Sequence, residues 1–213
     1  MGQQFGEARA QKDLAAYLSS GPSSTTRGLV EGLRAAGGLH GSVIDIGSGV
    51  GALALELLDA GASSAICVDL SAAFLDVARA EAARRGFLDR ISWHEGDFVT
   101  LAPSLPPADV VVLDRVVCCY RGFESLLTLA ATHSGRFVAF SYPRDRWYVR
   151  VMFHAGNLLR RVRRNAFTAF VHPPATMERL VLAQGFARVS RRESAVWRVA
   201  VYRRCAPPDP GGP

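Results

Sequence analysis

Residues 43–51 read Val-Ile-Asp-Ile-Gly-Ser-Gly-Val-Gly, an apolar run that ends in closely spaced glycines and continues into a segment rich in alanine and leucine. This order predicts a buried strand, a glycine turn and the start of a helix. Glycine lets the backbone turn sharply and approach a ligand, and a helix N-terminus offers free N–H groups and positive potential to an anion. We therefore expect a ligand with a negative or carboxylate group at this turn.

Outward from the turn, short β-branched runs alternate with alanine-rich helical segments. Strands are expected at SVIDI, AICVDL, ISWHEGDF, DVVVLD and FVAFSY, and helices at ALALELLDAG and AAFLDVARAEAARRG. This alternation predicts a parallel sheet covered on both faces. A late helix is expected to begin at the prolines 173–174 and to end at Gly185, and two last strands, roughly 187–193 and 196–203, would close the sheet.

The chain of 213 residues has the size of one domain with a small elaboration. Residues 1–205 are predicted to form this domain, with a helical N-terminal cap over 1–38 and a lid-like insertion over 144–172. The Pro- and Gly-rich end, residues 206–213, is predicted to be disordered. With 49% hydrophobic residues, the composition excludes wholesale disorder and collagen-like repeats.

Two ligand classes fit the glycine pattern. The spacing G-x-G-x-x-A from Gly47 satisfies the dinucleotide pattern, so an NAD(P)-dependent oxidoreductase is one alternative. Asp45, two residues before the first glycine, together with Gly51 gives the form D-x-G-x-G. This form resembles motif I of the class I S-adenosylmethionine-dependent methyltransferases. The resemblance covers residues 40–142 and implies a Rossmann-like, doubly wound α/β fold, with a mostly parallel seven-stranded sheet whose last strand is antiparallel.

The same resemblance implies S-adenosylmethionine as the cofactor, S-adenosylhomocysteine as the product, and contacts at the ends of the later strands. Asp69 would accept both ribose hydroxyls, Asp97 would bond the adenine amino group, and Phe98 would pack on the adenine ring. Asp69 and Asp97 can also be read as ordinary turn residues. The implied cofactor-binding residues are Asp45, Gly47, Ser48, Gly49, Gly51, Asp69, Leu70, Asp97, Phe98, Asp114 and Arg115.

The region after the fourth strand narrows the range of possible methyl acceptors. The motif N-P-P-[YF], typical of methyltransferases that act on planar nitrogens, is absent, because residues 114–120 read DRVVCCY. Residues 109–203 are similar to the branch of small-molecule methyltransferases that includes magnesium-protoporphyrin IX O-methyltransferase. The N-terminal segment departs from that enzyme and resembles a group of bacterial methyltransferases. A small hydrophobic or anionic acceptor is expected, with O- or C-methylation favoured.

Candidate catalytic residues lie near the predicted cofactor edge. They are Asp114, Tyr120, Tyr142, His154 and His172. A carboxylate acceptor is already ionised and needs only arginines to hold it, whereas a hydroxyl acceptor needs a general base. Each candidate also has a structural interpretation: Asp114 as a helix cap or a ligand of the cofactor's amino end, His154 as a core histidine, and His172 as the start of a helix.

Charge divides the chain into two unequal parts. Residues 1–114 carry a formal net charge of −6 and residues 115–213 one of +12. Residues 146–164 are apolar first and arginine-rich afterwards, which fits a lid over a hydrophobic anionic acceptor, a peripheral membrane contact, or a packed helix with a solvated end. A non-catalytic RNA- or membrane-binding module is the non-enzyme alternative, although no RNA-binding motif accompanies the arginines, so no nucleic acid partner is expected.

The four cysteines show no CxxC pair and no spacing for a tetrahedral metal site, so no metal is expected. The adjacent Cys118 and Cys119 are read first as small packing residues, and as reactive thiols only second. A signal peptide and a long apolar run are both missing, which leads us to expect a cytoplasmic protein with reduced thiols.

Overall fold

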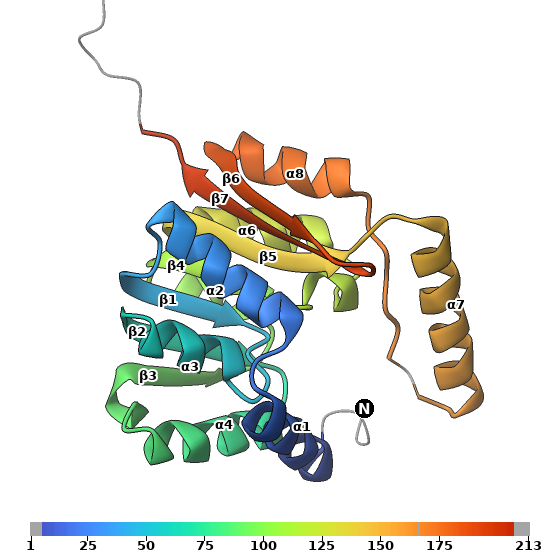
Figure 1. The fold of residues 1–213 in the computed structure, drawn as a ribbon, viewed down its shortest axis with the longest axis horizontal. Coiled ribbons are helices and arrows are strands. Elements are labelled where there is room, and N and C mark those ends of the chain that lie inside the picture. Colours follow the sequence, from blue (N-terminus) through green and yellow to red (C-terminus); the bar gives the residue numbers. More distant parts are fainter. Residues whose placement is uncertain (1–5, 166, 207–213) are drawn as a thin grey trace, which may run out of the picture.

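A computed structural model describes residues 6–165 and 167–206. Its centre is a seven-stranded sheet with the order β3-β2-β1-β4-β5-β7-β6, in which β7 runs antiparallel to both of its neighbours (Figure 1). The strands are β1 Gly41–Ile46, β2 Ala62–Asp69, β3 Ile91–Glu95, β4 Ala108–Leu113, β5 Ser134–Pro143, β6 Phe186–Glu193 and β7 Trp197–Arg204. The predicted fold class, including the antiparallel last strand, is therefore confirmed.

Helices cover both faces of the sheet. They are α1 Glu7–Ser20, α2 Ser24–Ala36, α3 Ala52–Asp59, α4 Ala72–Arg84, α5 Phe98–Leu101, α6 Phe123–Thr132, α7 Trp147–Val162 and α8 Pro174–Ala183. One apolar core joins the sheet to α2, α3 and α4, and a second joins the other face to α5, α6 and α8. Alternate side chains along each strand enter opposite cores: Val110 and Val112 enter the first, and Val111 and Leu113 the second.

The central strands form because they are apolar on both faces. β4 and the second half of β1 are buried, as the near-continuous valine and isoleucine runs predict. β1 lies between β2 and β4, and the chain crosses from one side of the sheet to the other at this point. The carboxyl ends of β1, β2 and β4 therefore meet at the switch point, where α/β sheets bind ligands.

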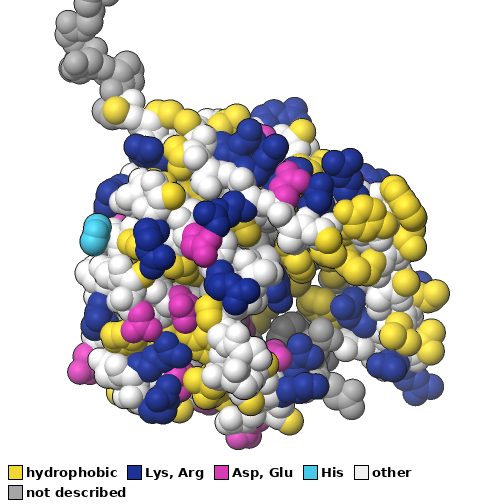
Figure 2. Space-filling model, in the orientation of Figure 1, with side chains coloured by type: hydrophobic (Ala, Val, Ile, Leu, Met, Phe, Trp, Pro, Cys, Tyr) yellow, Lys and Arg dark blue, Asp and Glu magenta, His cyan; other side chains and the backbone are white. Residues whose placement is uncertain are grey.

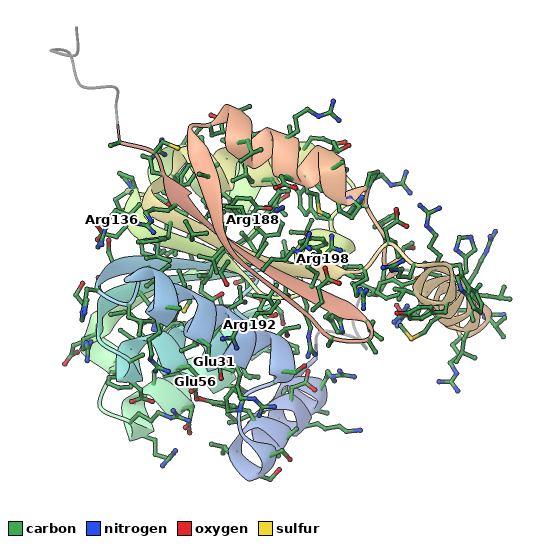
Figure 3. All side chains as sticks on the ribbon, turned by 45° about the horizontal axis from the view of Figure 1, so that its top comes forward. Glu31, Glu56, Arg136, Arg188, Arg192 and Arg198 are labelled. Atoms are coloured by element: carbon green, nitrogen blue, oxygen red, sulfur yellow. The ribbon has the colours of Figure 1, made fainter. Side chains whose placement is uncertain are left out.

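The N-terminal helices are tied to the sheet by polar contacts as well as by packing. The Tyr17 hydroxyl of α1 donates to the Glu56 carboxylate of α3 at 2.6 Å, and the Arg85 guanidinium lies 5.1 Å from the Tyr17 ring centroid. Arg192 of β6 pairs with Glu31 of α2, and both side chains are labelled in Figure 3 beside Glu56. Residues 1–5 of the predicted cap lie outside the described residues.

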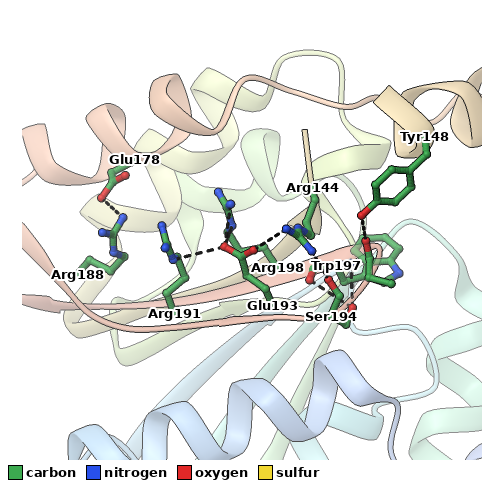
Figure 4. A network of polar contacts seen from close by, with 10 residues as sticks. Arg144, Tyr148, Glu178, Arg188, Arg191, Glu193, Ser194, Trp197 and Arg198 are labelled. Carbon is green, nitrogen blue, oxygen red and sulfur yellow. Dashed lines mark hydrogen bonds and ion pairs between the residues drawn. The ribbon is translucent and has the colours of Figure 1, made fainter. Parts of the chain in front are cut away.

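The antiparallel hairpin of β6 and β7 carries a charge network, which is drawn in Figure 4. Glu193 accepts from Arg198 at 2.8 Å, from Arg144 at 3.0 Å and from Arg191 at 3.5 Å. Burial alone would raise the pKa of Glu193, but the arginines outweigh it and lower that pKa below its usual value. The network fixes the start of the segment that leads from β5 into α7.

Helix α7 stands apart from the layers, at the right-hand side of Figure 1. Val149 is its only buried residue, whereas most of its other apolar side chains are exposed. The end of the chain lies beyond β7, and residues 207–213 of the predicted disordered tail lie outside the described residues.

Candidate functional site

The turn after β1 has the conformation that its glycines were expected to provide. Gly47, Gly49 and Gly51 all have positive φ, at 67°, 54° and 76°. A Cβ on Gly47 would lie 2.4 Å from a Val116 methyl group, so no side chain fits there. A Cβ on Gly49 would meet only the Phe74 ring, at 3.7 Å, and its open side faces the cavity described below. The turn therefore exposes backbone to a ligand.

Two carboxylates hold this turn. Asp45 is buried and accepts from the Ala54 N–H of α3 at 3.2 Å, and burial raises the pKa of its carboxyl well above the usual range. Asp69, at the end of β2, accepts from the Gly49 N–H at 2.8 Å and from the Ser71 N–H at 2.9 Å. Burial also raises the pKa of Asp69. Asp69 lines the cavity, whereas Asp45 lies behind the turn and positions it.

The predicted adenine contacts lie at the start of α5. One Asp97 oxygen accepts from the Val99 N–H at 3.0 Å, and the other accepts from the Tyr120 hydroxyl at 2.7 Å. Burial, followed by the bond to Asp97, raises the pKa of Tyr120 to about 12. Phe98 is 2% exposed and meets the His133 ring edge-on, so only its margin reaches the cavity.

Asp114, just after β4, connects three parts of the fold. Its two oxygens accept from the Thr26 hydroxyl of α2 and the Ser141 hydroxyl of β5, each at 2.6 Å. The next residue, Arg115, has a positive φ of 62°, and its Nε donates to the Thr25 hydroxyl at 2.9 Å. The cap and the sheet thus meet at the edge of the cavity.

The cavity at this edge has a volume of about 620 Å³, within the range of small-molecule and cofactor sites. We call inner the part at the strand ends, which Asp69, Asp97 and Asp114 line. We call outer the part that Arg121, Phe167 and Phe170 line. Its lining includes Arg9, Asp13, Gly47, Gly49, Asp69, Leu70, Phe74, Asp97, Asp114, Arg115, Cys119, Tyr120, Arg121, Phe167, Thr168 and Phe170. The structure therefore brings together most of the predicted cofactor residues.

Three of the predicted catalytic residues do not line this cavity. His154 is exposed on α7 and is not the core histidine considered from the sequence. Tyr142 is 4% exposed within the second core, and burial raises its pKa. His172 stacks on Phe123 with ring centroids 4.1 Å apart, and its Nε2 donates to the Tyr120 carbonyl at 3.0 Å. The other two candidates, Asp114 and Tyr120, line the cavity.

Several residues in or beside the cavity were not anticipated from the sequence, and two of them, Thr25 and Thr26, bond residues at its edge without lining it. Thr25 and Thr26 belong to a stretch interpreted only as a break between helices, although Ser23 is the N-cap of α2 and the two threonines follow it. Phe167 and Phe170 come from the part of the predicted lid that follows α7, and no residue of α7 lines the cavity. The signal that could have revealed the threonines is their position in the first turn of a helix that follows a capping serine.

The cysteine pair lies on the outer side of the cavity. The two Sγ atoms of Cys118 and Cys119 are 3.6 Å apart, and Cys119 is exposed and lines the cavity. The neighbouring Cys118 thiol lowers the pKa of Cys119 below its usual value. Cys118 is buried, as the packing interpretation predicts.

Comparisons with known proteins agree with this site. Residues 43–133 match a family model described as a methyltransferase domain. No curated protein matches the sequence. Among solved structures, magnesium protoporphyrin IX methyltransferase from Synechocystis with bound S-adenosylhomocysteine is similar, with a TM-score of 0.71 and 22% identity over 85% of this chain and 82% of that one.

Two other similar structures are larger proteins. An O-methyltransferase family protein from Burkholderia thailandensis has a TM-score of 0.71 and 17% identity, over 92% of this chain and 59% of that one. Human N-acetylserotonin methyltransferase in complex with S-adenosylmethionine has a TM-score of 0.66 and 18% identity, over 95% of this chain and 58% of that one. Residues 43–133 therefore match a methyltransferase domain, and the chain shares the fold of S-adenosylmethionine-dependent methyltransferases, in agreement with the predicted resemblance.

Proposed function

We propose that this methyltransferase transfers the methyl group of S-adenosylmethionine to an oxygen atom of a small hydrophobic acceptor. The observation that carries the proposal is the cavity at the switch point, where the glycine turn and the carboxylates that follow β2, β3 and β4 converge. Neighbours with the same fold are described as O-methyltransferases or as methyltransferases with bound cofactor.

The inner cavity fits this cofactor in shape and charge. Gly49 leaves room for a ligand against the backbone, and Asp69 keeps free lone pairs that can accept ribose hydroxyls after its two backbone bonds are made. Asp97 and Leu70 would bind the adenine, and Asp114 would face the cationic amino acid end. When bound, the cofactor supplies an electrophilic methyl group, and the protein needs to align the acceptor and exclude water.

The outer cavity favours an anionic acceptor. The Arg121 guanidinium lies 5.8 Å from the Phe170 ring centroid, and Phe167 and Arg115 complete a basic and aromatic wall. No histidine is among the described residues that line the cavity, and both oxygens of Asp114 already accept hydrogen bonds. A carboxylate acceptor is ionised without a base, so these residues would suffice to hold it.

We also propose a cytoplasmic setting, a small-molecule partner, a peripheral membrane contact through residues 146–164, and no nucleic acid partner. Among the described residues, no helix is long and apolar enough to cross a membrane. The exposed apolar side chains of α7 support the peripheral contact. The lid-like role of residues 144–172 remains part of the proposal through Phe167, Thr168 and Phe170, which line the cavity.

Calorimetric titration of the purified protein tests the cofactor directly. S-adenosylhomocysteine is expected to bind with micromolar affinity, and Asp69→Ala is expected to lose this binding, because it removes the ribose acceptor and one anchor of the turn. Titrations with NAD(H) and NADP(H) test the oxidoreductase alternative. Binding of a nicotinamide nucleotide alone would overturn the proposal.

An acceptor screen follows, led by hydrophobic carboxylates and then phenols. Arg121→Met is expected to raise KM for a carboxylate acceptor about tenfold while leaving the cofactor affinity unchanged, because a lost charge-assisted hydrogen bond costs about 1.5 kcal/mol. Equal KM values for the variant and the wild type would remove Arg121 from the acceptor site.

A further inference from the structure

Helix α7 turns its less apolar side toward the protein. Val149 is fully buried, Phe153 meets the Trp197 ring at 6.3 Å, and Asn157 bonds the backbone of Ala169. These three residues recur every four positions, so they form one line along the helix. The Tyr148 hydroxyl adds a bond of 2.7 Å to the Ala195 carbonyl, which is drawn in Figure 4.

The opposite side of α7 is apolar and exposed. At about 100° per residue, six large apolar side chains fall within an arc of about 140° opposite the line of contact, and Tyr148, in the same arc near the start of the helix, reaches back to the Ala195 carbonyl. They form the outer stripe: Trp147, Val151, Met152, Leu158, Leu159 and Val162. Trp147 is 77% exposed, Val162 73% and Leu158 64%. Figure 2 shows hydrophobic side chains gathered on this flank of the molecule, with basic side chains beside them.

Basic charge predominates around the outer stripe, because the one acidic residue next to the start of α7, Asp145, is paired with Arg150. Between Arg146 and Met177 the sequence holds six arginines and no acidic residue. Arg161, Arg163 and Arg164, at the end of the helix, form no ion pair with any residue that the structure describes. A helix with an apolar face and free arginines at its border matches an anionic lipid surface, in whose plane such helices lie.

We propose that the outer stripe of α7 docks on an anionic bilayer, with its apolar side chains in the interface and its terminal arginines on the lipid headgroups. A second copy of the chain fits less well, because self-pairing would place arginines against arginines. The helix is too short to span the membrane, so it lies along the surface.

The docked helix would also set the position of the cavity rim. Asn157 accepts from the Ala169 N–H at 3.0 Å and donates to its carbonyl at 2.8 Å, and residues on either side of Ala169 line the cavity. Phe170 is fixed in turn by the bond from its N–H to the Cys118 carbonyl at 2.7 Å. The cavity would thus face an interface in which a hydrophobic anion accumulates. This consequence rests on the proposed methyl transfer, whereas the docking surface, which specifies the residues and the lipid charge of the peripheral contact proposed above, does not.

Vesicle co-sedimentation tests the docking. The wild type is expected to bind vesicles of phosphatidylcholine mixed with phosphatidylserine more tightly than vesicles of phosphatidylcholine alone, and to lose binding as salt is raised. The double variant Val151→Asp/Leu158→Asp is expected to bind the anionic vesicles at least roughly tenfold more weakly than the wild type, because it removes two large apolar contacts. Arg163→Gln and Arg164→Gln are each expected to weaken binding about fivefold. Trp147 fluorescence should shift to shorter wavelength on binding.

Leu182→Asp, at an exposed position of α8, is the matched control and is expected to bind vesicles like the wild type. Failure of the wild type to bind either vesicle would overturn the docking, as would full binding by the double variant. A dimer in sedimentation velocity that the double variant dissociates would assign the stripe to a second copy instead. Tighter binding to single-stranded RNA than to the anionic vesicles would assign the arginines to nucleic acid.

Titration with S-adenosylhomocysteine keeps the two proposals apart. The double variant, Arg163→Gln and Arg164→Gln are all expected to bind S-adenosylhomocysteine like the wild type, because none of the substituted residues lines the cavity. Vesicle binding without any cofactor binding would leave the docking standing and overturn the proposed function.

Discussion

The glycine turn with its strand ends and helix α7 are both close to the cavity, but they are held in opposite ways. In the turn, the polar groups are already bonded within the chain, as when Asp69 accepts from two backbone N–H groups. In α7, one residue is buried and the large apolar side chains face outward. The conformation of the turn is determined by local sequence, whereas the position of α7 depends on the surface that its exposed face contacts. Four predictions test this contrast, in order of decreasing effect.

The strongest test is Gly49→Val, which should reduce the affinity for S-adenosylhomocysteine at least about a hundredfold, or about 2.7 kcal/mol. The new side chain would enter the cavity from a residue with a φ of 54°. Gly86→Val is the matched control, because Gly86 has a φ of 75°, lies in the turn after α4 and has open space around it. Equal affinities in the two variants would mean that the turn does not face the ligand.

A smaller loss is expected from Asp69→Asn, which keeps the size of the side chain and removes its charge. Binding of S-adenosylhomocysteine should weaken about tenfold, because hydrogen bonds to a charged acceptor contribute about 1.5 kcal/mol or more. Calorimetry measures this directly, and circular dichroism reports whether the fold is kept. An unchanged affinity would show that Asp69 serves the turn alone.

The ion pairs of Glu81 in α4 give a prediction about pH, and one of its partners, Arg85, also lies against the Tyr17 ring of the cap. Hydrogen bonds from Arg84 and then Arg85 hold the pKa of Glu81 at about 2, against its usual 4.5. A pKa that is lower in the folded state means that the stabilisation is fully present above about pH 4.5 and is lost as the pH falls toward 2. Glu81→Gln should lower the free energy of unfolding by about 1 kcal/mol near neutral pH and flatten its acid dependence.

Urea unfolding at several pH values measures both effects. Glu95→Gln is the control, because Glu95 is exposed and forms no ion pair with the described residues. A parallel acid dependence in Glu81→Gln and the wild type would contradict the assignment.

The smallest effect is expected for Val151→Ser in α7. The free energy of unfolding should change by no more than about 0.5 kcal/mol, because the side chain is 59% exposed. Leu29→Ala, in the buried face of α2, should cost about 3 kcal/mol in the same measurement. Comparable losses in the two variants would mean that α7 packs against the protein in solution.

The parts of the fold that depend on local sequence could be predicted. The valine and isoleucine runs predict β1 and β4, and the glycines and acidic residues after successive strands indicate the edge of the sheet where the cavity lies. Each of these features is local, because a strand end and the turn after it determine where a side chain lies.

The acceptor side could not be predicted in the same way, because it is made by distant contacts. His154, between Phe153 and Ala155, suggested a core position, but the line of Val149 and Asn157 turns it to the surface. His172 is held by ring stacking and by the Tyr120 carbonyl, which no spacing along the chain reveals. Thr26 meets Asp114 across 88 positions of sequence.

The bond from Thr26 to Asp114 has a consequence for motion. Helix α2 cannot leave the sheet without breaking this hydrogen bond, so opening of the cap frees the Asp114 carboxylate within the cavity. Any ligand that binds only the closed form then shifts this local opening equilibrium by mass action. The backbone amides of α2 should exchange their hydrogens more slowly as the ligand concentration rises, so their exchange rate would report how much of the site is occupied.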